Sequence, residues 1–461
     1  MELKQRAQMD PAYQWDLTAI YENDAAWERA MEKAAEAVKE LKGLPGTLGA
    51  SAQALADGLD KIYAASALVE RAYIYATLRR DGDNGDARGQ EMSGKSTTLY
   101  VEFSTNTAFL EPEILAIDEK TLAEYLKEER LATYRHLIGN IVRGRAHVLG
   151  AEQEKMLAML SDAAGGFRKS FSMLESVDMS FPAITDEAGE SVTLSHGNFA
   201  VYRESRDQRV RKEAFEAYFG EFKRYINTFA ALYEGSVKMD CYYAKVRGFD
   251  GACEAALFGT NVPIAVYDAL TDAVHDAFPT MQRYLALRKK QLGVKELHMY
   301  DLYCPMVENV DISVPFADAK TLVKKALAPL GEEYAKLLDR AFAEKWIDVY
   351  ENKGKTTGAF SCGVFGVHPY VLLNYTDTLD DAFTLAHELG HSMHSYFSDH
   401  TQDYVNHDYR IMVAEVASTV NEVLLTKYLL SVETDPARRA HILNHFLEGF
   451  RTTVFRQTLF A

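Results

Sequence analysis

The sequence predicts a mainly α fold, an α-rich member of the α+β class. Three observations lead to this prediction. Apolar residues recur at three- and four-residue steps through most of the 461 residues. Segments with the two-residue alternation of strands are few and short. These strand-like segments gather just before a motif-bearing helix at 378–397, so we expect a small sheet beside that helix.

The first 160 residues are predicted to form long helices with short connections. Asn23 or Asp24 can cap a first helix, which stops at Gly43. A second helix starts near Ser51 and ends near 82–85, and a third covers 87–109. Short connections of this kind indicate antiparallel neighbours.

The middle of the chain alternates between strand-like and helical patterns. A turn at 186–189 with β-branched flanks predicts a short hairpin within 167–195. Helical periodicity then covers 207–248, 262–293 and 317–345, and 297–303 is predicted to be a strand.

Composition excludes several classes of function. The net charge of -17 argues against a nucleic-acid partner, because phosphate contacts need clustered Lys and Arg. No run of 18 apolar residues and no signal-type start occur, so we expect a cytoplasmic protein without a membrane partner. The four cysteines are widely spaced without a CxxC pair, and buried free thiols are the expected state.

Glycines concentrate between two candidate strands, 346–350 and 370–375. The phosphate-binding spacing G-x-x-x-x-G-K-[ST] is absent there. Two interpretations stay open: a mobile surface connection, or a flexible strand edge against which a peptide backbone could pair.

The helix at 378–397 carries an H-E-x-x-H motif at His387, Glu388 and His391. Residues four apart lie on one helical face, so both imidazoles can bind one metal ion. Glu388 is rotated away and suits a general base that acts on a water molecule. The alternative is two histidines on a solvated face, which fits poorly with the apolar residues around them.

A third ligand is predicted in the next helix, DYRIMVAEVASTVNEVLLTKYLL, whose apolar residues predict burial on nearly all sides. Glu415, Ser418 and Glu422 form a polar stripe along it, and buried carboxylates are costly without a partner. We therefore expect Glu415 to complete a zinc site, with Ser418 and Glu422 orienting the ligands. Ion pairs with Lys or Arg are the alternative for both carboxylates. His394 is expected to line the cleft.

The segments HELGHSMHSYF, EVASTVNEVLL and KTTGAFSCGVFGVHPYVLLNY resemble the M3 metallopeptidases, in particular the oligoendopeptidase F branch. The resemblance runs along nearly all of the chain, including WDLTAIYENDAAW. It implies one Zn²⁺ held by His387, His391 and Glu415, and Glu388 as general base. It also implies two helical lobes around a deep channel for short unstructured peptides. The substrate-contacting residues that it implies are Gly358, Ala359, Phe360, His368 and Tyr370.

The resemblance also guides the expected domain organisation. We expect an N-terminal helical lobe at 1–115, a helical and hairpin connection at 116–195, and a catalytic domain at 196–461. Family members continue beyond the equivalent of Ala461 into a part with a His and Tyr cluster, and the apolar pattern ends here without a cap. We therefore expect a C-terminally incomplete copy.

The predicted function is zinc-dependent cleavage of internal bonds in short peptides. A metallocarboxypeptidase could use the same motif, and a peptide-binding protein without turnover would fit an incomplete chain. A purely structural helical scaffold is the remaining alternative. The sequence does not predict the oligomeric state.

Overall fold

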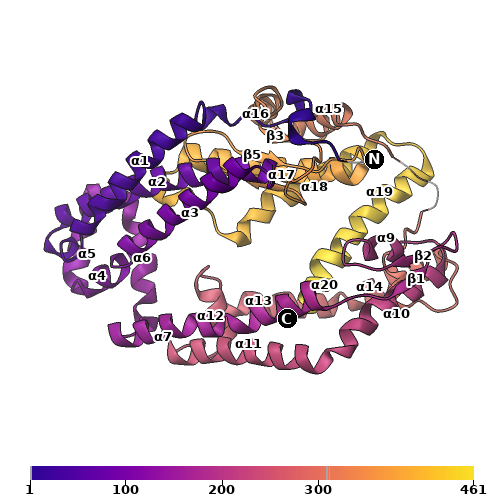
Figure 1. The fold of residues 1–461 in the computed structure, drawn as a ribbon, viewed down its shortest axis with the longest axis horizontal. Helices are drawn as coiled ribbons and strands as arrows, with labels where there is room; N and C mark the ends of the chain where they lie inside the picture. The colour runs from indigo at the N-terminus through magenta and orange to yellow at the C-terminus, as the bar shows by residue number, and fades with distance from the viewer. Residues whose placement is uncertain (1–2, 308–309, 311) are drawn as a thin grey trace. The chain divides into compact units, whose positions relative to one another are not determined.

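The computed structural model describes residues 3–307, 310 and 312–461, and helices dominate it, as predicted (Figure 1). The chain folds into two compact units. Unit 1 contains Met1–Arg145 and Asp311–Glu433, and unit 2 contains Ala146–Val310 and Thr434–Ala461. Each unit thus joins segments that are distant in sequence. This division differs from the three consecutive regions expected at 1–115, 116–195 and 196–461, because contacts between distant segments leave no local sequence pattern.

Unit 1 holds two groups of helices and a small sheet. Its elements are α1 (Asp24–Glu40), α2 (Ala52–Gly82), α3 (Ala87–Thr107), α4 (Leu110–Ala116), α5 (Glu119–Tyr125), α6 (Arg135–Arg143), α15 (Phe316–Ala326), α16 (Glu332–Ala343), β3 (Ile347–Asp348), β4 (Phe360–Cys362), β5 (Tyr370–Leu372), α17 (Leu379–Thr401) and α18 (Ile411–Val432). Helices α1, α2 and α3 pack side by side, as the first 110 residues predict (Figure 1).

One apolar cluster joins the start of the chain to the sheet. Trp15 and Trp27 pack with Ala72 of α2 and with Tyr370 and Leu372 of β5. The Trp27 indole also donates a hydrogen bond to the carbonyl of Ala72 at 2.9 Å. Burial of large aromatic side chains on both sides of this contact fixes the sheet against α2.

The sheet has three strands in the order β3-β5-β4. Strand β5 pairs in parallel with β3 and antiparallel with β4, with Ser361 opposite Val371. Both strands predicted at 346–350 and 370–375 are present in shorter form. Strand β4 lies inside the glycine-dense stretch, for which a strand edge was one of the two interpretations. Asn374 donates through Nδ2 to the carbonyls of Thr356 and Gly358, at 3.0 and 2.8 Å, and ties this stretch to the sheet. Because β4 is an outer strand, one of its edges has no partner strand within the described ranges.

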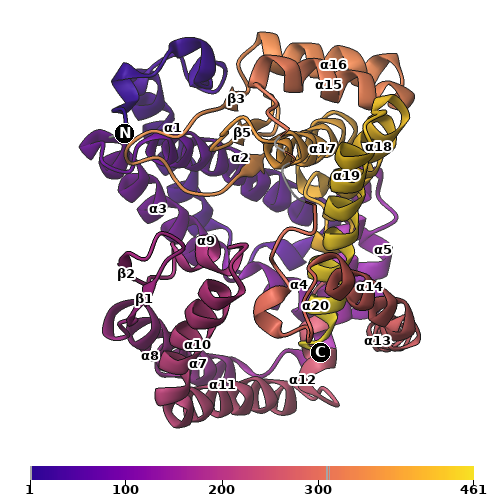
Figure 2. The same ribbon diagram turned by 90° about the vertical axis from the view of Figure 1, so that its right-hand side faces the viewer.

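Helix α17 begins where the sequence predicts. Thr378 caps it through a capping box with Asp381, and the Asp381 carboxylate also accepts hydrogen bonds from Thr376. Its inner face is buried against both β4 and α18. The sheet therefore lies directly beside the helix that carries the H-E-x-x-H motif, as predicted (Figure 2).

Helix α18 departs from the prediction of burial on nearly all sides. Ile411, Met412, Val413, Val416 and Val420 are between 42% and 70% exposed. Among the described residues, α17 and α15 pack against α18, and Tyr334 of α16 hydrogen-bonds to Asn421 of this helix. Sequence periodicity gives the apolar character of a helix but not the number of neighbours that cover it, and here the prediction was wrong.

Unit 2 is a second group of helices with one hairpin. Its elements are α7 (Ala151–Ala164), α8 (Gly166–Met173), β1 (Ala183–Thr185), β2 (Ser191–Thr193), α9 (Phe199–Arg203), α10 (Gln208–Arg224), α11 (Ile226–Val246), α12 (Ala252–Phe258), α13 (Ile264–Asp276), α14 (Phe278–Gln291), α19 (Pro436–Gly449) and α20 (Arg456–Thr458). The antiparallel pairing of β1 and β2 confirms the predicted hairpin.

The strand predicted at 297–303 is wrong. Met299–Asp301 forms a 3-10 helix instead. Asp301 is fully buried, accepts a 2.9 Å hydrogen bond from the backbone of His298 and pairs with the buried guanidinium of Arg211 at 2.6 Å. An ion pair between α10 and this segment therefore outweighs its local strand preference.

The cysteines are free, as predicted, but only Cys304 is fully buried. Cys241 and Cys253 are exposed on helices α11 and α12, so the expectation of buried thiols is wrong for these two residues. Within the described ranges, no helix is both long and apolar enough to cross a membrane.

Candidate active site

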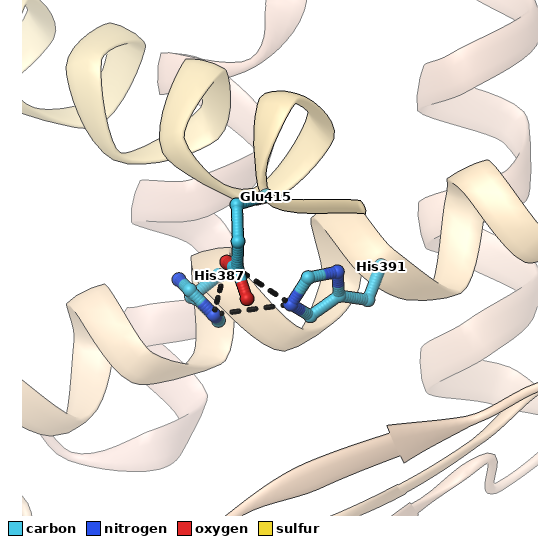
Figure 3. A group of neighbouring side chains, drawn as sticks. All are labelled: His387, His391 and Glu415. Atoms are coloured by element: carbon cyan, nitrogen blue, oxygen red, sulfur yellow. Dashed lines mark hydrogen bonds and ion pairs between the residues drawn. The ribbon is translucent and has the colours of Figure 1, made fainter. Parts of the chain in front are cut away.

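The two histidines of the motif point their ring nitrogens toward one another from successive turns of α17 (Figure 3). Nε2 of His387 lies 3.1 Å from Nε2 of His391. The four-residue spacing places both rings on one face of the helix, as predicted from the sequence.

Glu415 reaches the two imidazoles from the neighbouring helix α18 (Figure 3). Its Oε2 atom lies 3.5 Å from Nε2 of His387 and 3.5 Å from Nε2 of His391. The ligand atoms of these three residues all lie within 4.8 Å of one another, so His387, His391 and Glu415 form a group that could hold a metal ion. We refer to these three residues as the 387–391–415 group.

Gly390 allows α17 and α18 to approach closely enough for this convergence. A Cβ atom at Gly390 would lie 2.7 Å from Cα of Ser418 and 2.8 Å from the carbonyl oxygen of Ala417. The buried amide of Asn421 adds a hydrogen bond across the same contact, from Nδ2 to the carbonyl of Ala386 at 2.9 Å. The sequence analysis missed both residues, although Gly390 stands inside the motif itself.

The outer atoms of the 387–391–415 group have their own partners. Nδ1 of His387 lies 2.5 Å from Oε1 of Glu422, and the His391 ring hydrogen-bonds to the backbone of Ala414. The hydroxyl of Ser418 donates to Oε2 of Glu415 at 2.8 Å. Ser418 and Glu422 therefore contact the two residues that they were expected to orient.

Burial and neighbouring charges shift the pKa values of the site. Burial raises the pKa of Glu388 to about 7; His387 opposes this rise, and the carboxylates of Glu415 and Glu422 add to it. Glu388 is 7% exposed. A carboxyl group with this pKa can exchange a proton near neutral pH.

The two imidazoles are shifted in opposite directions. Burial opposes the charged form of His387, but its hydrogen bond to Glu422 and the nearby carboxylates raise its pKa overall. Burial and the proximity of His387 lower the pKa of His391, although Glu415 acts in the opposite direction.

The residues predicted to contact substrate fall into two sets. Gly358 is exposed, and Ala359 and Phe360 are half-buried, at the beginning of β4. His368 and Tyr370 are buried instead; the His368 ring stacks on Trp346 with ring centroids 4.7 Å apart. His368 is 7% exposed and Tyr370 fully buried, and their contact with a peptide stays a prediction.

His394 lies one turn beyond His391 on α17. Its ring stacks on Tyr409, with centroids 3.7 Å apart. Burial lowers the pKa of His394, and its Nδ1 atom is buried without a hydrogen-bond partner among the described residues. His394 therefore lies near the group, on the side where the 407–409 segment packs.

The fold and the site together define a helical protein with a histidine and carboxylate group on two adjoining helices. The family model described as "Peptidase family M3" matches residues 201–461, and the model described as "Oligopeptidase F" matches residues 113–181. The chain belongs to peptidase family M3.

Named relatives agree with this assignment. The chain is 42% identical to "Oligopeptidase PepF" of Bacillus subtilis over 461 residues, which is 100% of this chain and 69% of that protein. The structure of oligoendopeptidase-F from Enterococcus faecium matches with a TM-score of 0.68 and 36% identity, over 95% of this chain and 73% of that one. A candidate peptidase from Chlamydophila abortus gives a TM-score of 0.89 with 32% identity, over 100% and 77%.

Proposed function

We propose that this protein is a zinc-dependent endopeptidase that hydrolyses internal bonds of short oligopeptides. The convergence of His387, His391 and Glu415 from two helices carries the proposal. Family membership supplies the peptidase class. The names oligopeptidase and oligoendopeptidase of the relatives support short peptides as substrates.

The geometry of the 387–391–415 group fits zinc. Two ligand atoms at the usual zinc distances, separated by a tetrahedral angle, lie about 3.3 Å apart. The three separations here are 3.1, 3.5 and 3.5 Å. Nδ1 of His387 is held by Glu422, so its Nε2 faces Nε2 of His391, and one cation could bind both nitrogens.

His387, His391 and Glu415 would hold the ion, and Glu422 and Ser418 would orient them. A bound zinc ion supplies Lewis-acid polarisation of the scissile carbonyl and of a water molecule. Glu388 accepts the proton of the attacking water and later delivers it to the leaving amine. Because water is the nucleophile, no acyl-enzyme forms.

We place the substrate along β4. The outer edge of this strand has no partner strand among the described residues, so an extended peptide could pair with it. Contacts between β4 and α17 keep the strand beside the motif helix. Gly358, Ala359 and Phe360 would contact the peptide at the start of this strand, and His394 would line the cleft beyond the metal. A channel between two lobes and a cytoplasmic location stay predictions.

The deciding experiment measures zinc content and cleavage of internally quenched peptides on one preparation, with and without a chelator. We expect one zinc per chain and cleavage that chelation abolishes and added zinc restores. Mass spectra of the products separate the alternatives, since internal cuts exclude a carboxypeptidase. Peptide binding without products would instead indicate a binding protein, and the absence of both zinc and binding would leave a scaffold.

A further inference from the structure

Strand β4 meets helix α17 through a hydrogen bond between two serine side chains. Oγ of Ser361, the middle residue of β4, lies 2.8 Å from Oγ of Ser392 on α17. Ser392 is fully buried, and its own hydroxyl donates to the backbone carbonyl of Glu388 at 2.9 Å. The two serines therefore connect the strand proposed to bind the peptide with the residue proposed as general base.

The direction of this hydrogen bond follows from the number of hydroxyl hydrogens. A serine hydroxyl has a single hydrogen to donate and two lone pairs that accept. Because Ser392 donates its hydrogen to the carbonyl of Glu388, it accepts the hydrogen bond from Ser361. Ser361 then has no second hydrogen to donate to a substrate, so its hydroxyl holds the strand in place rather than taking part in the reaction.

The alternation of side chains along β4 explains why Ser361 points toward α17. Successive residues of a strand project to opposite sides of the sheet. Phe360 and Cys362 pack against the apolar cluster that contains Trp15 and Tyr370. The residue between them therefore projects to the other side, where the helix lies. A polar side chain at this position is half-buried and has its partner on α17.

A second contact, directly after β4, brings the chain close to the helix. A Cβ atom at Gly363 would lie 3.0 Å from Cβ of Ser395, which is three residues beyond Ser392 on α17. A side chain at this position would push the two segments apart, so glycine permits the close approach of the backbone. The short distance between β4 and α17 thus depends on small residues, and the hydrogen bond from Ser361 to Ser392 fixes the strand at that distance.

Ser392 also determines which side of α17 the strand occupies. Residues four apart on a helix project from the same side, so the side chains of Glu388 and Ser392 share one face. His387 is turned away from Glu388 by about 100°, the rotation between successive helical residues. Strand β4 contacts α17 at Ser392 and is therefore held on the side of the motif helix that carries Glu388.

We propose that Ser361 and Ser392 are positioning residues for peptide hydrolysis, because their hydrogen bond sets the distance between a peptide paired with β4 and the Glu388 carboxylate. The inference rests on the proposed peptidase function and on the placement of the substrate along β4. Reacting groups have to be held within a narrow range of distances, and a misplacement of about 1 Å can lower the rate by about a hundredfold. Loss of the hydrogen bond slows the chemical step, while the backbone edge of β4 still binds the peptide.

Steady-state kinetics of Ser361→Ala and Ser392→Ala with an internally quenched peptide tests the proposal. In each variant we expect kcat to fall by about ten- to a hundredfold with KM and zinc content unchanged, the pattern of a lost transition-state interaction. The double variant should lose no more than either single variant, because both substitutions remove the same hydrogen bond. An unchanged kcat, a loss confined to KM, or losses that multiply in the double variant would overturn the proposal. No cleavage by the wild-type protein would instead refute the proposed function.

Ser96→Ala is the matched control for a general loss of stability. Ser96 is a buried residue of α3, and its hydroxyl donates to the carbonyl of Ser93 at 3.1 Å, much as Ser392 donates to its own helix. We expect Ser96→Ala to lower the free energy of unfolding about as much as Ser392→Ala and to keep the wild-type kcat. An equal fall in kcat in both variants would assign the effect to stability and overturn the proposal.

Ser361→Thr tests whether the hydroxyl itself is needed. Threonine retains the hydrogen-bond donor and suits a strand, so this variant should recover most of the kcat that Ser361→Ala loses. If Ser392→Ala does not fold, the comparison of alanine with threonine at the half-buried Ser361 decides the question. A threonine variant as slow as the alanine variant would overturn the proposal.

Discussion

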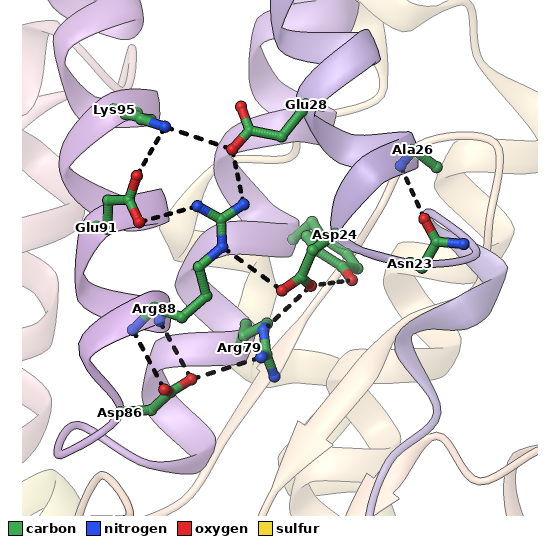
Figure 4. Close-up of polar contacts among 11 residues, drawn as sticks. Asn23, Asp24, Ala26, Glu28, Arg79, Asp86, Arg88, Glu91 and Lys95 are labelled. Carbon is green, nitrogen blue, oxygen red and sulfur yellow. Dashed lines mark hydrogen bonds and ion pairs between the residues drawn. The ribbon is translucent and has the colours of Figure 1, made fainter.

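Two clusters of charged side chains in unit 1 differ in character, and one of them has the properties of a reactive site. The first is a network on α1, α2 and α3 (Figure 4). There Arg88 pairs with Glu28 at 2.6 Å and with Glu91 at 2.9 Å, and Lys95 pairs with Glu91 at 2.8 Å. A hydrogen bond from Arg88 is the main cause of the lowered pKa of Glu28.

The second place is the site on α17 and α18, where the signs of the charges are not balanced. Glu415 and Glu422 face imidazoles, and Glu388 is buried beside them with a pKa raised to about 7. In the network each carboxylate pairs with a nearby Arg or Lys, so the charges stabilise one another. At the site the carboxylates lack such bases, and a bound cation would compensate them. The comparison teaches that unbalanced charge, more than the number of charges, marks the functional region.

Of the substitutions at these two places, Glu388→Gln is expected to have the largest effect. Loss of the general base should lower kcat for peptide cleavage by about a hundred- to ten-thousandfold, with zinc content unchanged. Steady-state kinetics and metal analysis of the same sample measure both quantities. Glu91→Gln in the network should leave kcat as it is, and normal hydrolysis by Glu388→Gln would refute its role.

Glu415→Ala should weaken metal binding rather than proton transfer. Removing the proposed ligand should lower zinc affinity by more than the about 10- to 100-fold typical of an orienting residue. Competition with a chelator of known affinity gives the value. Unchanged affinity and stoichiometry would remove Glu415 from the ligand set.

Glu422→Gln should have a smaller effect of the same kind. Glu422 contacts Nδ1 of His387, not the metal position, and its loss should lower zinc affinity by about 10- to 100-fold. The same competition assay applies. An effect as large as that of Glu415→Ala would mean that the two carboxylates have been assigned in the wrong order.

Gly390→Ala tests the contact that brings the two helices together. Its added methyl group would overlap the backbone of Ser418, and such overpacking costs about 1–3 kcal/mol of unfolding free energy. Gly94→Ala in α3 is the matched control, since nothing lies within 4 Å of its Cβ position and alanine favours a helix. Denaturant unfolding of both variants gives the comparison. Equal stability of the two would show that α17 and α18 can separate without cost.

The smallest effect is expected in the network. Arg88→Gln should lower the free energy of unfolding by no more than about 1 kcal/mol, because the pairs are partly exposed and screened by solvent. The lowered pKa of Glu28 makes the free energy of unfolding depend on pH. Its pairing contributes above the ordinary pKa of 4.5, and this contribution is lost as the pH falls through the lower pKa of the folded state. The free energy of unfolding of both proteins, measured at several pH values and at high salt, would reveal any larger contribution of the network to stability.

Sequence periodicity predicted the parts of the site that depend on one helix. The spacing of His387 and His391 fixes their common face, and the helix that carries them begins where the sequence predicts. The polar stripe on α18 also singled out Glu415, although the burial assumed for it was wrong, because its side chain is 57% exposed. These inferences needed only the geometry of single helices.

Other features depend on contacts that local patterns do not encode. The exposure of Val416, the 3-10 turn at Asp301 and the edge strand β4 each follow from which distant segments pack together. Gly390 is the clearest case. The motif allows any residue at its position, and only the structure reveals that the backbone of Ser418 leaves no room for a side chain.

The open edge of β4 has a consequence for the peptides themselves. A chain that lies along this edge has to offer its own amide hydrogens at every second residue. Proline has no amide hydrogen, so it would be rejected at those positions and accepted at the ones between them. This three-residue strand would therefore select peptides by their backbone hydrogen-bond donors, independently of side-chain recognition.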